Sequence, residues 1–114
     1  MNLAIGIIDQ FHRQFLAGED NVIYDQASDH YRSTMTRELN HAYLERIRSK
    51  MGTCSSSRAI RLFVTRSTRG TFVSASYLTE CTNGQLTEVF VIGVEERDAK
   101  LDRYGAQSPR LMVN

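Results

Sequence analysis

A group of side chains that could act in acid–base chemistry lies beside a short predicted helix over about Val22–Ala27. Asp25, Asp29 and His30 cluster there, and a carboxylate or an imidazole in such a place can act as a general base. A neighbouring phenol could donate a hydrogen bond to the same substrate. The candidate phenols are Tyr24, Tyr31 and Tyr77. The simpler alternative is that Asp29 caps a turn, Asp25 is solvated and the tyrosines pack.

The remaining histidines and the two cysteines show no metal-ligand spacing. His12 and His41 have no partner at a typical ligand distance along the chain, and neither Cys54 nor Cys81 lies in a C-x-x-C motif. We therefore expect structural or solvated histidines, no metal site and no cofactor.

The overall composition predicts one globular domain over residues 1–114. Hydrophobic residues make up 41% and charged residues 24% of the chain, which is typical of a folded domain. The net charge of +1 gives no electrostatic reason to expect nucleic acid as the partner. No apolar run approaches the roughly 20 residues of a membrane helix, so no transmembrane segment is predicted. The apolar start ends at Asp9 without a basic leader or a cleavage site, so it is not an intact signal peptide.

Periodicity predicts three helices in the first half of the chain, over about Asn2–Ala17, Val22–Ala27 and Arg37–Met51. Asp20 and Asn21 could cap the second helix and Thr36 the third. Gly18 and Gly52 lie where left-handed C-terminal caps would be. The expected buried side chains are Leu3, Ile7, Ile8, Phe11, Phe15, Val22, Ile23, Ala27, Leu39, Tyr43, Ile47 and Met51.

After Ser55 the pattern changes to a period of two and predicts four strands. They cover about Arg58–Arg66, Thr71–Cys81, Gln85–Glu95 and Lys100–Ser108. Asn83-Gly84 predicts a two-residue type I′ turn.

That turn sets a register between the second and third predicted strands. The expected facing pairs on one apolar face are Cys81/Leu86, Thr79/Glu88, Tyr77/Phe90, Ala75/Ile92 and Val73/Val94. A second tight turn at Thr68-Arg69 adds Val64, Leu62 and Ile60 to the same face, opposite Val73, Ala75 and Tyr77. The agreement of two independent turns on one hydrophobic face supports the assignment.

The same register brings the cysteines together. It places Ser56 opposite Cys81 and Cys54 one diagonal step away, so that a small irregularity would allow a disulfide. We predict this Cys54–Cys81 bond, with two free buried thiols as the alternative. The bond would imply a periplasmic or extracellular protein.

Glu88 is a carboxylate on the apolar face of the predicted sheet. A buried carboxylate needs a partner or a raised pKa, which would make Glu88 a pocket acid. Because it is two pairs from the hairpin tip, we favour a solvated rim, or an ion pair with an arginine of the third helix.

The other face of the sheet predicts an interface. Phe72, Leu78, Val89 and Val91 would lie close together on a face that helices leave uncovered, and such a patch favours homodimerisation. The nearby Arg58, Arg61, Arg66 and Arg69 could form an anion-contacting patch, but solvated pairs with glutamates of neighbouring strands are the simpler interpretation.

The order of elements resembles the cystatin-like, or NTF2-like, α+β fold. Phe15-Leu16-Ala17-Gly18-Glu19-Asp20 looks like the end of that superfamily's first helix. Tyr24-Asp25-Gln26-Ala27-Ser28, the Leu39-to-Gly52 helix and Tyr104-Gly105-Ala106-Gln107-Ser108 look similar to small, often exported bacterial domains of unknown function. The resemblance implies N-terminal helices packed on a curved four-stranded antiparallel meander. It transfers no catalytic residues, because this fold hosts many functions.

The preferred interpretation is a non-enzymatic binding or protein-interaction module, exported and dimeric. The alternative is a small-ligand pocket protein, or an enzyme of the ketosteroid isomerase or dehydratase type that uses Asp25, Asp29, His30 or Glu88. A third option is a component of a bacterial envelope assembly. A pocket protein needs a cavity with convergent polar side chains between the first helix and the sheet. The module interpretation instead fills that space with Phe11, Phe15, Tyr43, Tyr77 and Phe90.

Overall fold

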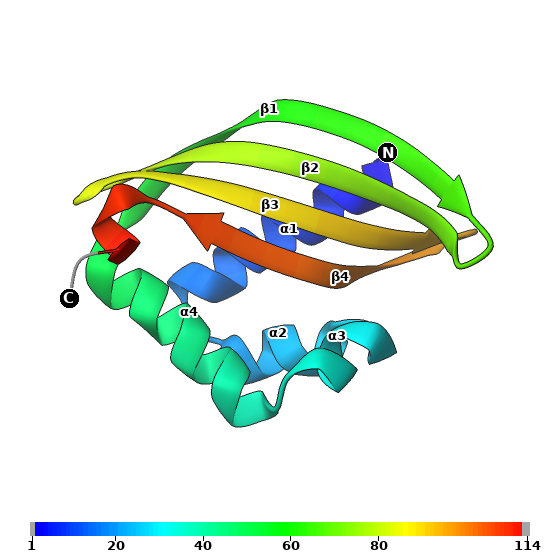
Figure 1. The fold of residues 1–114 in the computed structure, drawn as a ribbon, viewed down its shortest axis with the longest axis horizontal. Coiled ribbons are helices and arrows are strands. Elements are labelled where there is room, and N and C mark those ends of the chain that lie inside the picture. The colour runs from blue at the N-terminus through cyan, green and yellow to red at the C-terminus, as the bar shows by residue number, and fades with distance from the viewer. Residues whose placement is uncertain (1, 113–114) are drawn as a thin grey trace.

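The computed structural model describes residues 2–112 and shows an α+β fold, with helices first and a sheet after them. The helices are α1 (Asn2–Leu16), α2 (Asp20–Gln26), α3 (Asp29–Thr34) and α4 (Arg37–Met51), and a 3-10 turn, η1 (Pro109–Met112), follows the sheet. The strands are β1 (Cys54–Ser67), β2 (Gly70–Cys81), β3 (Gly84–Glu95) and β4 (Asp98–Gln107). They form an antiparallel meander in the order β1-β2-β3-β4. The sheet curves over the helices, as the prediction required (Figure 1).

The core lies between α1 and the helix-facing side of the sheet. The buried side chains of α1 are Ala4, Ile8, Phe11 and Phe15. Those of the strands include Val73, Ala75, Tyr77, Leu86, Phe90, Ile92 and Leu101. Tyr77 and Phe90 lie on the same face, with ring centroids 5.7 Å apart. The aromatic filling expected for this space is therefore present, with Tyr43 only partly buried.

β1 departs from the expected core. Leu62 and Val64 lie opposite Ala75 and Val73 as predicted, yet their side chains are 39% and 46% exposed. α1 packs on β3 and β4, so the helix layer does not reach far enough to bury the outer strand. Ile60 is 49% exposed and sits in a register shift, so Ala59 and not Ile60 faces Tyr77.

The hairpin between β2 and β3 turns one residue earlier than predicted, which shifts the pairing partner of each β2 residue by two residues. Cys81 pairs with Gly84, so the two turn residues are Thr82 and Asn83. Neither has a positive φ, which a type I′ turn requires. Thr79 therefore faces Leu86 and Tyr77 faces Glu88. Because the slip is an even number of residues, every side chain stays on its predicted face.

Two bulges in β1 bring the cysteines together. Register shifts occur between Ala59 and Arg61 and between Cys54 and Ser56, and they place Cys54 opposite Cys81. The two residues form a disulfide, which is compatible with an oxidising compartment. It closes a loop with a sequence separation of 27, and a loop of that size contributes about 3 kcal/mol of stability.

The helices differ from the prediction at several places, and Leu3 and Val22, which were predicted to be buried, are 41% and 39% exposed. Residues Asp29–Thr34 form the short helix α3, capped by Ser28, whose hydroxyl accepts from the backbone N–H of Tyr31 at 3.1 Å. The sequence had suggested only a turn here. Leu39, predicted to be buried, is 60% exposed, because α4 buries the faces of Asn40 and Leu44 instead. Thr36 caps α4 as expected.

Asp20, the predicted cap of α2, has a different role. The N-cap is Glu19, without a side-chain hydrogen bond, and Asp20 is buried with its carboxylate against α4. Arg48 donates to both carboxylate oxygens, at 2.8 and 2.5 Å, and to the carbonyl of Phe15 at 3.1 Å. His41 lies 2.7 Å from the same carboxylate. Asp20 therefore ties the ends of α1, α2 and α4 together.

Replacing Asp20 by Ala would leave the Arg48 guanidinium without its main partner, so we expect a loss of about 3 kcal/mol in the free energy of unfolding. Asp25→Ala on the same helix is the matched control. Asp25 pairs with Arg37 at 2.7 Å, but both side chains are about half exposed, and such surface pairs contribute about 0.5 kcal/mol. Urea denaturation of both variants measures the difference, and equal losses would contradict this account of Asp20.

Candidate ligand pocket

Glu88 is a buried carboxylate at the centre of a polar cluster. It lies on β3 with 1% of its surface exposed, so the expected solvated rim was wrong. Its Oε1 lies 2.8 Å from His12 Nε2 and accepts the Thr79 hydroxyl at 2.6 Å. Its Oε2 accepts the Tyr104 hydroxyl at 2.6 Å. The donors come from α1, β2 and β4, so one carboxylate joins three elements.

The contacts of Glu88 favour its ionised form in the folded protein at neutral pH. Burial by itself raises the pKa of Glu88, but the hydrogen bond and charge of His12, together with the Thr79 and Tyr104 hydroxyls, hold that pKa below its ordinary value. Burial, with the nearby Glu88 carboxylate, raises the pKa of Tyr104 well above its usual range. Tyr104 therefore stays protonated and remains a donor.

A further hydroxyl extends the cluster to the edge strand. Ser57 Oγ lies 2.7 Å from Thr79 Oγ1, and because Thr79 donates to Glu88, Ser57 must donate to Thr79. Ser57 reaches this position because the bulge between Ala59 and Arg61 shifts the start of β1 by one residue and places Ser57 opposite Thr79. The result is a chain of hydroxyl groups that leads from β1 to the buried carboxylate.

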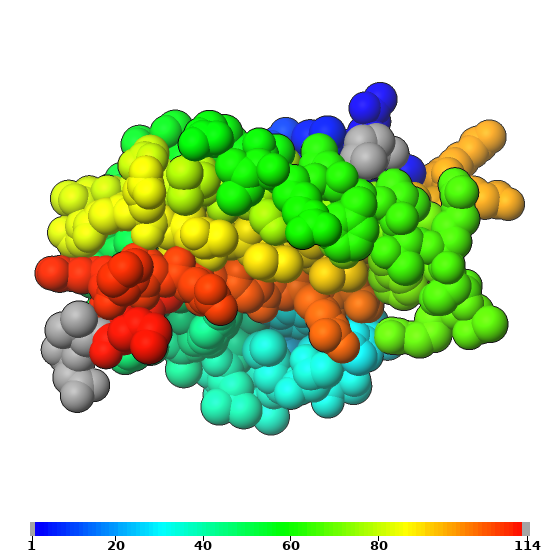
Figure 2. Space-filling view, turned by 45° about the horizontal axis from the view of Figure 1, so that its top comes forward, coloured from blue at the N-terminus to red at the C-terminus, as the bar shows by residue number. Residues whose placement is uncertain are grey.

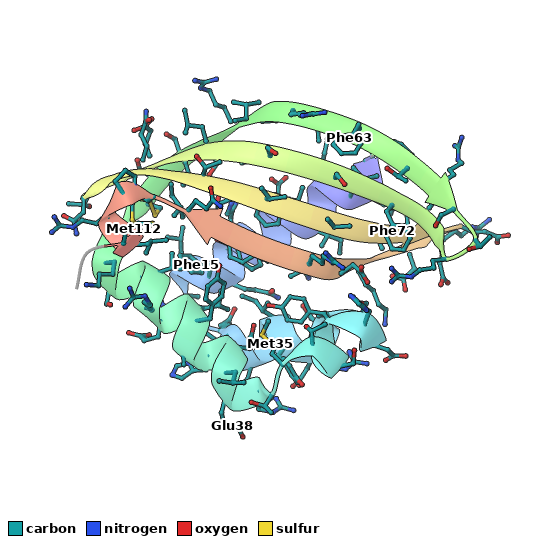
Figure 3. The ribbon with its side chains drawn as sticks, in the orientation of Figure 1. Phe15, Met35, Glu38, Phe63, Phe72 and Met112 are labelled. Carbon is teal, nitrogen blue, oxygen red and sulfur yellow. A yellow bond between two sulfur atoms is a disulfide. The ribbon has the colours of Figure 1, made fainter. Side chains whose placement is uncertain are left out.

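The cluster lines a cavity of about 240 Å³ between α1 and the start of β1. Its polar wall contains His12, Ser57, Thr79 and Glu88, and Asp9 also lines it. The other walls consist of Phe15, Leu16, Leu86, Cys54, Ser55 and Ser56. Figure 3 shows Phe15 on α1 beneath the sheet. The pocket therefore combines convergent polar groups with an apolar surface formed by Phe15, Leu16 and Leu86.

The structure does not bring the six predicted pocket residues into one site. Tyr24 donates to the carbonyls of Arg32 and Met35, at 3.0 and 2.8 Å, and so fixes the α3–α4 connection. Asp25 is in its surface ion pair. Tyr77 is buried beside the His12 ring, with centroids 5.9 Å apart.

Asp29 and His30 line a different cavity of about 560 Å³, at the other end of the sheet. This cavity lies between α3 and the turns that join β1 to β2 and β3 to β4, and Phe72 and Asp102 also line it. His30 Nε2 is buried there without a hydrogen-bond partner. Asp29 instead pairs with Arg32, which also donates to the carbonyl of Ala27.

One group of possible metal ligands occurs within residues 2–112. The ligand atoms of Asp20, His41 and Glu45 lie within 4.8 Å of one another. Arg48, however, donates to both Asp20 oxygens and to Glu45 at 3.0 Å. The guanidinium charge would repel a cation, so we interpret this group as an ion-pair network.

The predicted interface residues lie on the sheet face away from the helices. Phe72, Leu78 and Val91 are half-buried and Val89 is 44% exposed. Phe63 on β1, which sequence reasoning did not include, adds a ring that is 45% exposed. Figure 3 shows Phe63 and Phe72 on neighbouring strands. We call these five residues the outer-face patch.

Comparison of the chain with protein-family models and with curated proteins finds no match. Within residues 2–112, none of the helices combines the length and apolar character needed to cross a membrane.

The lowered pKa of Glu88 predicts a specific acid sensitivity. Because the folded pKa lies below the ordinary value of 4.5, the unfolded chain takes up the proton first as pH falls. The stabilisation is therefore complete above pH 4.5 and is lost below it. At neutral pH, Glu88→Gln should lower the free energy of unfolding by about 2 kcal/mol, because an amide cannot replace a carboxylate that accepts three donors.

Urea unfolding between pH 3 and 7 measures this effect. The wild-type stability should fall more steeply below pH 4.5 than that of Glu88→Gln, and the exposed Glu96→Gln should keep the wild-type slope. Parallel slopes for wild type and Glu88→Gln would contradict an ionised Glu88.

Proposed function

We propose that this chain is a non-enzymatic binding protein that holds a small molecule in the pocket beside Glu88. The observation that carries the proposal is the Glu88 carboxylate, buried at the wall of a 240 Å³ cavity and held by three donors. Both oxygens of Glu88 are already engaged and its pKa is low, so it is a poor general base. Glu88 is instead suited to orient His12 and the chain of hydroxyl groups. This role supports ligand binding more than proton transfer.

The lining indicates the class of ligand. Two carboxylates, Asp9 and Glu88, border the cavity, so an anionic ligand would be repelled, whereas a neutral or cationic polar group would be accepted. Phe15, Leu16 and Leu86 offer an apolar surface to the rest of the ligand. The volume is slightly below the range typical of drug-sized molecules, which favours a compact ligand with one polar end.

The cystatin-like, or NTF2-like, resemblance is part of the same proposal. The order of helices and strands supports it, and the disulfide supports a protein exported to an oxidising compartment. A binding protein of the bacterial periplasm or cell envelope is consistent with both features.

Three matched probes test the ligand class: benzyl alcohol, benzylamine and benzoate, titrated into isotope-labelled protein and followed by NMR. We expect benzyl alcohol and benzylamine to shift the amide resonances of His12, Ser57 and Thr79 at concentrations where benzoate does not. Ser57→Leu should fill the cavity and reduce these shifts at least tenfold. Thr65→Leu adds the same side chain to an exposed position of β1 and should leave them unchanged.

Equal shifts with benzoate, or shifts that Ser57→Leu does not reduce, would contradict the proposed pocket. Circular dichroism and the melting temperature of Ser57→Leu show whether that variant is folded.

The outer-face patch supports a second proposal, that two copies associate through the uncovered face of the sheet. Phe63 and Val89 expose nearly half of their surface on this face, and exposed apolar side chains gathered on one face are typical of interfaces. The guanidinium carbon of Arg61 lies 5.1 Å from the centre of the Phe63 ring. Across a symmetric interface, this positive charge would face Arg61 of the second copy.

Sedimentation at several protein concentrations tests this association. Val89→Asp should weaken it at least tenfold, while Thr87→Asp, a polar position two residues away on the same face, should weaken it less. Added salt should strengthen the association by screening the arginines. A protein that stays monomeric at high concentration and high salt would exclude the dimer.

A further inference from the structure

The two edges of the sheet differ in whether their backbone is covered. At the β4 edge, the N–H of Ser28 donates to the carbonyl of Leu101 at 2.9 Å, and the N–H of Ala106 donates to the Tyr43 hydroxyl at 3.1 Å. At the β1 edge, every residue from Ser55 to Ser67 is exposed. In Figure 2, β1 forms the green rim of the sheet. β1 is thus an open edge strand.

The last part of β1 is a regular strand with free backbone groups. Its pairing with β2 is uninterrupted from Arg61 to Ser67, where Ser67 and Gly70 close the turn. The pair that closes a two-residue hairpin exchanges both hydrogen bonds, and hydrogen-bonded pairs then alternate along the ladder. Leu62, Val64 and Arg66 therefore direct their N–H and C=O groups away from β2, toward open space.

The side chains of this segment are apolar on both faces of the sheet. Leu62 and Val64 lie on the helix side, whereas Phe63 lies on the outer side. All three are large hydrophobic residues with exposed side chains. Natural proteins usually protect a long apolar edge, because it is a template for another strand. The bulge at Ala59 and the turn at Thr68 limit the free segment to about this length.

The charge of the edge indicates which strand it accepts. Arg58, Arg61, Arg66 and Arg69 lie between Cys54 and Gly70, and this segment contains no Asp or Glu. If β1 paired with β1 of a second copy, arginines would face arginines or neutral residues in every register. A strand of another protein with acidic side chains would instead place opposite charges across the pair.

We infer that β1, from Arg61 to Ser67, binds an extended segment of another protein by strand addition, and that this segment carries apolar residues flanked by acidic ones. Main-chain hydrogen bonds to Leu62, Val64 and Arg66 would give the affinity. The exposed apolar side chains and the arginines would select the partner. This site is separate from the pocket beside Glu88, so either can fail without the other.

Synthetic peptides of alternating valine and threonine test the inference. One carries two glutamates at each end, the second carries lysines in their place, and the third is the glutamate peptide with alternate backbone nitrogens methylated. Fluorescence anisotropy should show binding of the glutamate peptide that weakens as salt is added. The lysine and methylated peptides should bind at least tenfold more weakly.

Variants of β1 separate backbone pairing from side-chain contact. Val64→Pro removes an outward N–H without removing a bond to β2, and it should weaken binding of the glutamate peptide at least tenfold. Val64→Ala keeps the N–H and should weaken binding less. The double variant Arg61→Glu, Arg66→Glu should reverse the preference toward the lysine peptide, an outcome that misfolding cannot produce.

Three results would overturn the inference: equal binding of the methylated peptide, unchanged preference in the double charge variant, or peptide-induced NMR shifts confined to residues outside β1. Concentration-dependent self-association that Val64→Pro abolishes would also overturn it, by showing that the occupant is a second copy.

Discussion

A carboxylate that is removed from water must be surrounded by donors, and Glu88 meets this requirement with groups from three elements. His12 contributes from α1, Thr79 from β2 and Tyr104 from β4. Each donor is usable only if its element lies in the correct place, because a buried carboxylate that loses a partner is strongly destabilising. The position of α1 beneath the sheet is therefore specified by polar geometry as well as by apolar packing around Phe11 and Phe90.

The same network explains why this end of the molecule is hollow. Aromatic rings fill the centre of the core, with Phe11 contacting Phe90 edge to face at a centroid distance of 5.2 Å. Beyond His12, the lining changes to serine and threonine hydroxyls and the disulfide. Short side chains leave space that the aromatic residues would have occupied. The disulfide fixes Cys54 at the rim, and the bulge between Ala59 and Arg61 places Ser57 opposite Thr79, so a covalent bond and a backbone irregularity shape the cavity together.

Much of the architecture could be predicted because it depends on two features of the sequence. These are the periodic alternation of apolar and polar side chains and the residues that begin and end helices and strands. The helices around Phe11 and Ile47, the four strands and the Cys54–Cys81 pair all follow from period, glycine placement and register. The turn at Thr82-Asn83 was missed because Asn83-Gly84 matches a stronger local preference, yet the even slip left the faces intact. The short helix α3 has too few residues to show a period.

The site was harder to predict, because it depends on which strands the helices cover. Glu88 was recognised as an acid on the apolar face, but nothing in the sequence showed that α1 crosses β3 so as to place His12 above it. His12 itself has no local pattern that distinguishes it from a packed histidine. The exposure of Leu62 and Val64 has the same origin. The period-two pattern of a strand shows which side chains share a face of the sheet, but it does not show whether a helix covers that face.

The coverage of the β4 edge by Ser28 and Tyr43 sets a limit on how this sheet can grow. A sheet with two bare edges can add strands at both sides and extend without end, as fibrils do. Here the β4 edge is covered by Ser28 and Tyr43 of the same chain, so the sheet can add strands only at the β1 edge. A partner strand that binds along β1 would leave the β4 edge of this chain covered. This chain can therefore end a sheet, but it cannot by itself extend one from both edges.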